Sequence, residues 1–438
     1  MQVKFFTNAA MEIIMSPQVR ILCDPWFTPG AFDGSWWHWP PLYTKPEELS
    51  DYTHLYVSHI HQDHCDLKSL RRLPNKDVPV VILKKKDDQF LRRRIMSCGF
   101  RNFIEVCDRE SVPLGPDGAV TLTMYEAFAP SVFVENAEVP NIIDSSIVVS
   151  SEEGVIFNAN DNVPNARVCE EIRQRHNEIA IAMLPYSGVG PYPSSYSNLT
   201  PEEKLDAAKA KATKYLSRLV ENARVLCPRL VVPCAGQMIL GGRNAFKNQT
   251  LGTPDVSEAH ESLTKSGFQS RLLFEGDVLS FPSGDIEIAS RPAPPDRNEY
   301  IEKIGQCRYW WQDAFQVPRH ELVELLPLLQ IARERMWRYQ ERFGFSSDWS
   351  VGVTLLESFG STYAFSLAKC GKVEKIRTGE FIAEDKILQV IIPYNYLLAI
   401  LTRHCHWNNA YHGCLVDWFR QPDDYIPDIQ VLLSYFHL

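Results

Sequence analysis

Short apolar runs separated by polar turns dominate the first part of the chain. Branched and large apolar residues fill runs of strand length, and turn-forming residues lie between them. These runs cover residues 3–6, 11–15, 19–23, 55–57, 78–83, 120–124, 147–149 and 155–157. The pattern predicts a β-rich beginning with short helices between some strands, such as residues 67–73.

The pattern changes to helical spacing at Thr200. The sequence Thr-Pro-Glu-Glu at 200–203 offers an N-cap, a proline at the first helical position and a glutamate three residues after the cap. Apolar residues then recur every three or four positions, which predicts a helix with one apolar face. A strand with a buried character follows at 230–233. Strand runs followed by strand–helix alternation predict sheets covered by helices.

The proline-rich segment at 291–296 predicts a linker between two domains. We expect a first domain over residues 1–288, a linker over 289–298 and a smaller C-terminal α+β domain over 299–438. The second domain should contain a long helix from about 319 to 343 and several strands between 350 and 392.

Composition and charge restrict the class of protein. Of 438 residues, 45% are hydrophobic and 23% charged, which is ordinary for a globular chain. The net charge of −9 argues against a nucleic-acid polymer as partner, because such binding needs a basic face. The apolar stretch at 391–401 is interrupted and shorter than the about 20 residues that a membrane span needs. With no visible signal peptide and eleven scattered cysteines, we expect reduced thiols and a cytoplasmic protein without membrane contact.

Three histidines and an aspartate within six residues form the most informative segment, His59-Ile60-His61-Gln62-Asp63-His64. It follows an apolar run, and ligand sites of layered α/β folds gather beyond the carboxyl ends of strands. Packing these groups together in a core would be costly unless a cation organises them. Mixed histidine and carboxylate sets suit zinc or non-haem iron. The alternative interpretation is a solvated histidine cluster.

The pattern His-x-His-x-Asp-His after a strand resembles the metallo-β-lactamase superfamily. This resemblance implies an α/β fold, a metallo-β-lactamase-like αββα sandwich, for the first domain. It also implies that His59 and His61 help to bind one metal, that Asp63 and His64 help to bind a second, and that Asp161 bridges the two. Asp161 and Asp63 are then the candidate catalytic residues.

A narrower resemblance covers most of the chain, weakly after the linker. The segments around 24–37, 144–149, 185–196 and 229–236 are similar to the catalytic part of the CMP-N-acetylneuraminate hydroxylase family. The resemblance implies oxygen-dependent hydroxylation at an iron site that is fed by a Rieske domain. No Rieske pattern of cysteines and histidines occurs in these 438 residues, so we expect an external donor such as a ferredoxin or reductase.

The chain departs from the superfamily at two metal ligands. No histidine occurs between His64 and Asp161, so Glu138 or Glu135 is a candidate replacement for the third one. The last histidine is replaced by Cys-Ala-Gly at 234–236, and His404, His406 and His412 are candidates to complete the site from the second domain. Exchanging imidazole for carboxylate favours iron, one or two ions, with zinc or manganese as the alternative.

Several residues are candidates for binding a small-molecule substrate. The aromatic cluster of Trp36 and Trp37 could stack on a sugar or base, although tryptophans also cover cores. The loop after the apolar run 179–184 combines flexible glycines with hydroxyl donors, although an ordinary turn-rich connection would look similar. Its candidates are Gly188, Tyr192, Ser194 and Tyr196, and His412 is added from the resemblance.

The sequence therefore favours an iron oxygenase that acts on a small polar substrate, either nucleotide-sugar-like or a natural product. A zinc or manganese hydrolase of phosphodiesters, lactones or amides is the first alternative, because a hydrolase also needs open metal positions. A non-catalytic scaffold that retains the fold is the second.

Overall fold

The computed structural model describes residues 1–437 except 86–88, 129–131, 135–136, 140–142 and 315–322, with the backbone alone at 132–134, 137–139 and 359. The predicted strands of the first part form two sheets. In spatial order, the larger sheet contains β18 (Ile286–Glu287), β17 (Val278–Ser280), β1 (Gln2–Thr7), β2 (Ala10–Ser16), β3 (Val19–Cys23), β5 (His54–Tyr56), β6 (Val80–Leu83) and β7 (Phe103–Val106). The smaller contains β15 (Leu230–Cys234), β14 (Ile181–Pro185), β13 (Gly154–Asn158), β12 (Ser145–Ser151), β9 (Val120–Glu126) and β8 (Ser111–Leu114).

The two sheets pack face to face through one apolar cluster. Phe5 and Ile21 of the larger sheet join Ile147 and Ile181 of the smaller sheet in this cluster, and all four are buried. The apolar runs found in the sequence are therefore buried strands of a two-sheet core, as expected where helices cover the outer faces.

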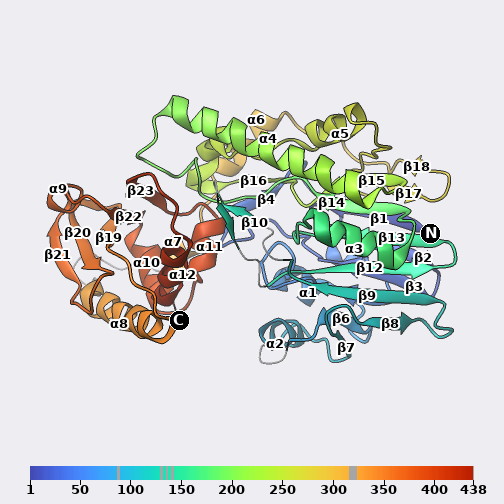
Figure 1. Cartoon of the computed structure of the whole chain (residues 1–438), viewed down its shortest axis with the longest axis horizontal. Coiled ribbons are helices and arrows are strands. Elements are labelled where there is room, and N and C mark those ends of the chain that lie inside the picture. Colours follow the sequence, from blue (N-terminus) through green and yellow to red (C-terminus); the bar gives the residue numbers. More distant parts are fainter. Residues whose placement is uncertain (86–88, 129–131, 135–136, 140–142, 315–322, 438) are drawn as a thin grey trace.

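Helices cover both outer faces of the sheets (Figure 1). The smaller sheet carries α3 (Ala166–His176), α4 (Pro201–Leu226) and α5 (Val256–Lys265), and the larger carries α1 (Leu67–Arg72) and α2 (Phe90–Met96). The predicted start of α4 is confirmed, because the Thr200 side chain accepts a hydrogen bond from the Glu203 amide and the Glu203 carboxylate accepts one from the Thr200 amide. The first part is thus an αββα sandwich, as the sequence predicted.

Short elements complete this part of the molecule. They are the strand pairs β4 (Trp36–His38) with β16 (Met238–Leu240) and β10 (Val132–Val134) with β11 (Ala137–Val139), the 3-10 helices η1 (Pro46–Glu48) and η2 (Gly242–Thr250), and helix α6 (Arg297–Gly305). Helix α6, which begins within the last two residues of the predicted linker, packs against η2. The domain boundary at 289–298 stays a prediction.

The C-terminal part is a five-stranded mixed sheet with helices packed on it. Its strands, in spatial order, are β21 (Glu374–Arg377), β20 (Ser358–Ser366), β19 (Ser350–Leu355), β22 (Ile387–Ile392) and β23 (Asp417–Gln421). Its helices are α7 (Trp310–Ala314), α8 (Leu325–Phe343), α9 (Thr378–Phe381), α10 (Tyr394–Leu401), α11 (Trp407–His412) and α12 (Pro427–Leu433), followed by η4 (Ser434–Phe436). Helix α8 begins at Leu325, later than the predicted 319, and residues 319–322 lie outside the described part. No helix among the described residues has the length and apolar character needed to cross a membrane.

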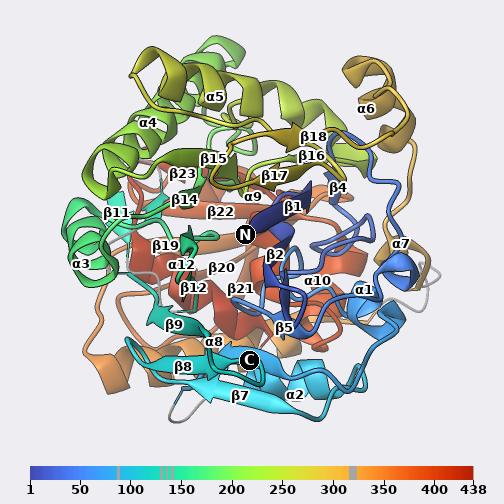
Figure 2. The ribbon, with the colours of Figure 1, turned by 90° about the vertical axis from the view of Figure 1, so that its right-hand side faces the viewer.

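Polar contacts fix the C-terminal part to one end of the sandwich. The Tyr396 hydroxyl donates a hydrogen bond of 2.9 Å to Asp33, and the Ser35 hydroxyl donates one of 2.6 Å to the Gly413 carbonyl. The Lys247 ammonium donates to the Cys414 carbonyl. Figure 1 shows the C-terminal part, in orange and red, beside the sandwich, and Figure 2 shows it behind the sheets.

Candidate metal centre

The histidine segment lies in the connection between β5 and α1. Strand β5 is hydrogen-bonded in parallel to β3 and β6, so the loop begins at the carboxyl edge of this group of strands. His59, Asp63 and His64 are buried and His61 is partly buried. The loop therefore holds its imidazoles inward, at the end of the sandwich that faces the C-terminal part.

Two histidines of this loop meet a carboxylate from the opposite sheet. His59 Nε2 lies 2.9 Å from His61 Nδ1 and 3.4 Å from Asp144 Oδ1. One ligand atom from each of the three residues lies within 4.8 Å of the others. Asp144 directly precedes β12, and sequence reasoning did not assign it as a ligand.

A second ligand set adjoins the first and shares His59 with it. His59, His64 and Asp161 also bring one ligand atom each to within 4.8 Å of the others. His64 Nε2 lies 3.2 Å from Asp161 Oδ2 and 3.4 Å from Asp63 Oδ2. Asp63 Oδ1 is buried and has no hydrogen-bond partner among the described residues. A buried carboxylate oxygen without a partner beside an imidazole fits a cation, which would satisfy both.

Asp24 lies beneath the histidine loop and orients it. Its carboxylate accepts hydrogen bonds from the amide and the hydroxyl of Ser58, at 2.7 and 2.9 Å, and lies 3.0 Å from His64 Nδ1. A bond at Nδ1 leaves Nε2 of His64 to face Asp161, which is the arrangement of a carboxylate–histidine–metal triad. On the other side, the Asn8 amide donates to Asp63 Oδ2 at 3.2 Å.

Burial and neighbouring charges shift the pKa values of the three histidines in opposite directions. Burial, together with the neighbouring histidines, holds the pKa of His59 and of His61 well below the usual value. For His64, burial acts in the same direction, but the carboxylates of Asp161, Asp63 and Asp24 together raise the pKa well above the usual value. Neutral His59 and His61 have lone pairs ready for a cation, and the carboxylates around His64 supply the negative charge that a cation needs.

Several of these groups line an adjoining pocket. His61, Asp63, Asp144 and Asp161 line it together with residues of the glycine loop and the C-terminal part. Its other lining residues are Phe32, Trp36, Val163, Ser187, Gly188, Val189, Gly190, Tyr192, Lys211, Tyr215, Tyr411 and His412. Of these, sequence reasoning proposed Trp36, Gly188, Tyr192 and His412 as substrate contacts.

His412 enters the pocket from the C-terminal part. Its ring centroid lies 4.8 Å from that of His61, and its backbone carbonyl accepts a hydrogen bond from the Trp36 indole at 3.0 Å. His412 belongs to neither of the two ligand sets above. His404 and His406 make other contacts: His404 lies 3.0 Å from the Thr402 hydroxyl, and His406 caps α11.

The structure does not bring three of the other candidates to the lining of this pocket. Trp37 alternates with Trp36 along β4, and its indole packs on Gly241 and donates to the Gly34 carbonyl. Ser194 is buried and donates to the Pro191 carbonyl, and Tyr196 stacks on Trp418 in the C-terminal core. The side chain of Glu138, like residue 135, lies outside the described part.

Asp144 was missed because its place in the centre follows from strand pairing and not from a local motif. It stands directly before the strand that pairs with β13, and β13 leads to Asp161. Phe32 and Tyr215 were also missed as pocket residues, because only the tertiary packing brings them there.

Comparisons with known proteins agree with this architecture. Residues 19–217 match the model of the beta-lactamase superfamily domain. The chain is 34% identical over 306 residues to a protein of Mycolicibacterium smegmatis described as a Rieske 2Fe-2S iron-sulfur protein, an alignment that covers 68% of this chain and 56% of the relative. It is 26% identical to the cytidine monophosphate-N-acetylneuraminic acid hydroxylase of Mus musculus over 54% of this chain and 39% of the relative.

The chain therefore contains a beta-lactamase superfamily domain and is homologous to the catalytic region of those hydroxylases, so both resemblances predicted from the sequence are confirmed. It spans about half the length of these curated relatives or less. Among solved structures, CmlA from Streptomyces venezuelae, a diiron beta-hydroxylase, has 13% identity and a TM-score of 0.41, with 63% of this chain and 53% of CmlA covered.

Proposed function

We propose that this protein is an iron-dependent oxygenase that hydroxylates a small polar substrate. The observation that carries the proposal is the ligand chemistry of the centre. Asp144 stands beside His59 and His61, where the superfamily pattern has a third histidine, and Asp63 and Asp161 surround His64. Carboxylate-rich sets with histidines favour iron or manganese over zinc. The sequence similarity to hydroxylases supports the same assignment.

The roles of the residues follow from their positions. His59, His61 and Asp144 would hold one iron, and Asp63, His64 and Asp161 a second, with His59 belonging to both of the ligand sets described above. Bound iron supplies the reaction with dioxygen, with electrons from a Rieske- or ferredoxin-type donor. Asp24 keeps His64 in the required orientation, and Asn8 holds Asp63.

The pocket residues bind and orient the substrate. Trp36 and Phe32 form an aromatic wall beside His61, with the rings of Phe32 and His61 5.9 Å apart between centroids. Gly188 and Gly190 carry no side chain into the pocket, so backbone can approach a substrate closely. The Lys211 ammonium, which is held by the carbonyls of Tyr192 and Leu251, places a positive charge at the pocket. A polar substrate with an anionic group, such as a nucleotide sugar or an acidic natural product, matches this lining.

Metal analysis of protein purified without oxygen tests the proposal. We expect iron by elemental analysis, a non-haem iron signature in Mössbauer or spin spectra, and oxygen consumption that depends on a reductant. The Asp144→Ala variant should lose iron, whereas Asp51→Ala, which changes an exposed carboxylate, should retain it.

Two results would reject the oxygenase. Full zinc with little iron, together with turnover of phosphodiesters or lactones without a reductant, would identify a hydrolase instead. Tight binding of no metal, with function unchanged in the His59→Ala/His61→Ala variant, would identify a scaffold. As a further check, Asp144→His should shift the metal content towards zinc, because it supplies imidazole in place of carboxylate.

A further inference from the structure

The outer face of helices α1 and α2 carries positive charge, although the net charge of the chain is −9. Lys68 and Arg71 lie three residues apart on α1, and both are exposed. On α2, Arg93 is exposed and Arg94 is partly buried. Residues 84–94, of which 86–88 lie outside the described part, contain six cations and two carboxylates. Lys68, Arg71, Arg93 and Arg94 therefore form a basic surface on an acidic protein.

The two helices are joined, so their cations belong to one surface. Helix α1 contacts α2, and the Cys98 thiol, just after α2, donates to the Leu67 carbonyl at the start of α1 at 3.7 Å. Burial raises the pKa of Cys98, and nearby Arg71 acts against this shift. Burial raises the pKa of Cys65 to about 12, and nearby Arg94 acts against it in the same way. Cations of both helices thus lie beside the same junction.

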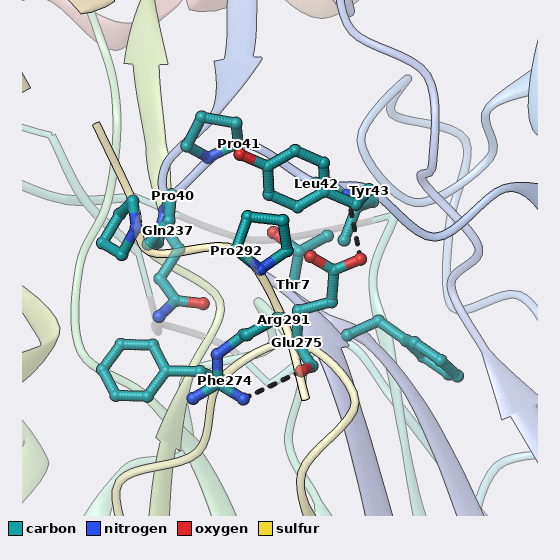
Figure 3. Close-up of a pocket in the computed structure, with 12 residues that line it drawn as sticks. Thr7, Pro40, Pro41, Leu42, Tyr43, Gln237, Phe274, Glu275, Arg291 and Pro292 are labelled. Carbon is teal, nitrogen blue, oxygen red and sulfur yellow. Dashed lines mark hydrogen bonds between the residues drawn. The ribbon is translucent and has the colours of Figure 1, made fainter. Parts of the chain in front are cut away.

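The basic surface lacks the ion pairs that compensate arginines elsewhere in the molecule. Arg291, at the cavity drawn in Figure 3, donates to both carboxylate oxygens of Asp277 and to the Glu275 carbonyl. Arg72 and Arg92, which adjoin the basic surface, have carboxylate partners as well. Among the residues that the structure describes, none forms an ion pair with the four cations of the basic surface. Uncompensated charge of one sign favours a partner of the opposite sign.

An exposed aromatic side chain lies beside these cations. Phe90, at the start of α2, is 66% exposed and lies one helical turn before Arg93 and Arg94. Protein interfaces combine apolar contact with a polar rim, and weak electron-transfer complexes have small interfaces. Charge complementarity speeds the formation of such complexes. Cations around one aromatic ring therefore fit a small acidic protein.

The chain itself connects the basic surface to the metal loop. Asp66 is the N-cap of α1 and the second residue after His64. Its carboxylate accepts hydrogen bonds from the Ser69 hydroxyl, at 2.6 Å, and from the Thr28 hydroxyl. These bonds fix α1 to the segment that also contains Asp24, the partner of His64. A protein bound to α1 and α2 is thus connected to a proposed metal ligand through a few covalent and hydrogen bonds.

The basic surface does not overlap the metal pocket. None of its four cations lines that pocket, whose lysine, Lys211, lies on α4. Figure 2 shows α4 at the upper left, and α1 and α2 at the right and bottom. A partner on the basic surface therefore leaves the pocket free for a substrate.

We propose that the basic surface, with Phe90, is the docking site for a small acidic iron–sulfur protein that delivers electrons to the metal centre. This inference rests on the proposed function. The carboxylates of the carrier pair with the four cations, and an apolar side chain of the carrier contacts Phe90. A reduced [2Fe–2S] carrier gives up one electron. Two encounters therefore supply the two electrons that, with two protons and dioxygen, convert C–H to C–OH and release one water.

Calorimetric titration with an acidic plant-type [2Fe–2S] ferredoxin tests the surface on protein purified without oxygen. The Lys68→Glu/Arg71→Glu/Arg93→Glu variant should raise the Kd at least about tenfold, because three weak attractions become repulsions. Raising the ionic strength from about 0.05 to about 0.5 M should weaken binding by the unaltered chain, because salt screens exposed charges.

A matched control makes the same change of net charge on the opposite face of the sandwich. Arg173→Glu/Lys209→Glu/Arg224→Glu alters three exposed cations of α3 and α4 and should bind ferredoxin as the unaltered protein does. If the reversal variant does not fold, Lys68→Gln/Arg71→Gln/Arg93→Gln takes its place and should raise the Kd about threefold or more. Absence of ferredoxin binding, or equal binding by the control and the altered surface, would overturn the proposal.

Anaerobic reduction separates this proposal from the proposed function. The reversal variant should keep its iron and be reduced by dithionite as fast as the unaltered protein, but be reduced by ferredoxin at least about tenfold more slowly. Ferredoxin binding that needs these cations in a protein without iron would reject the oxygenase and retain the docking site. Binding of duplex DNA or phosphatidylserine vesicles at these cations, without ferredoxin binding, would assign the surface to another polyanion and reject the docking site.

Discussion

Replacing Asp24 by asparagine should weaken metal binding without touching any proposed ligand. Asp24 is fully buried, and asparagine has almost the same shape. Its oxygen can keep the bond from the Ser58 amide, but its NH₂ group then faces the Ser58 hydroxyl and His64 Nδ1. A donor at that position favours the His64 tautomer with its proton on Nε2, the atom that faces Asp161. The imidazole thereby loses its lone pair where the metal would sit.

The size of the effect follows from this change of tautomer. Loss of a partner that orients a ligand histidine typically costs 10–100-fold in metal affinity. Because asparagine opposes the required tautomer instead of merely removing support for it, we expect about 100-fold, or on the order of 3 kcal/mol.

Competition with a chelator under anaerobic conditions measures this loss as the apparent Kd for ferrous or manganous ion. Asp51→Asn, at a carboxylate whose side chain is 71% exposed, should bind as the unaltered protein does. An Asp24→Asn protein that is folded and binds metal within about twofold of the unaltered chain would refute the role given to Asp24 and to the His64 tautomer.

Three further predictions address packing, acid stability and the contact between the two parts. Gly188→Ala should destabilise the fold by about 1–3 kcal/mol in urea unfolding, because its Cβ would lie 2.0 Å from the Tyr215 hydroxyl oxygen, whereas Gly190→Ala, whose nearest neighbour is 3.8 Å away, should be neutral. Burial lowers the pKa of His38 from 6.5 to about 4, so the unfolded chain takes up this proton first as the pH falls. In the unaltered protein this uptake lowers the free energy of unfolding by on the order of 3 kcal/mol between about pH 6.5 and 4, and His38→Gln should lack this part of the fall. An unchanged dependence of the unfolding free energy on pH would contradict this. Tyr396→Phe should cost about 1.5–3 kcal/mol by chemical denaturation, because it removes a buried hydrogen bond to a carboxylate; a change below 0.5 kcal/mol would show that the contact contributes little.

The sheets and the histidine loop were predictable because their signals are local. Strand-length apolar runs mark the two sheets, and His59, His61 and His64 lie within six residues of one another at a strand end. A local rule also applies to the pair Trp36 and Trp37. Successive side chains of a strand point to opposite faces, so only one of the two can line a given pocket.

Asp144 was not predictable in this way. Its position beside His59 depends on how the two sheets face each other, which no local pattern encodes. The sequence directed attention to Glu138 and Glu135, and that expectation is untested because the side chain of Glu138 and residue 135 lie outside the described part. Tyr196 likewise looks like a loop tyrosine in the sequence, but the backbone pairing of its segment with Trp418 places it in the C-terminal core.

The contact between Asp33 and Tyr396 has a consequence for biosynthesis. These hydrogen-bonded residues are 363 positions apart, and His412 reaches the pocket from still later in the chain. Domains fold from the N-terminus onward during synthesis. The sandwich, which carries all six proposed ligands, therefore leaves the ribosome before the C-terminal part. For a time the nascent chain contains the ligand residues without the segment that later packs against them. The six proposed ligands are therefore reachable from more sides during synthesis than in the complete protein, where the C-terminal part lies against this end of the sandwich.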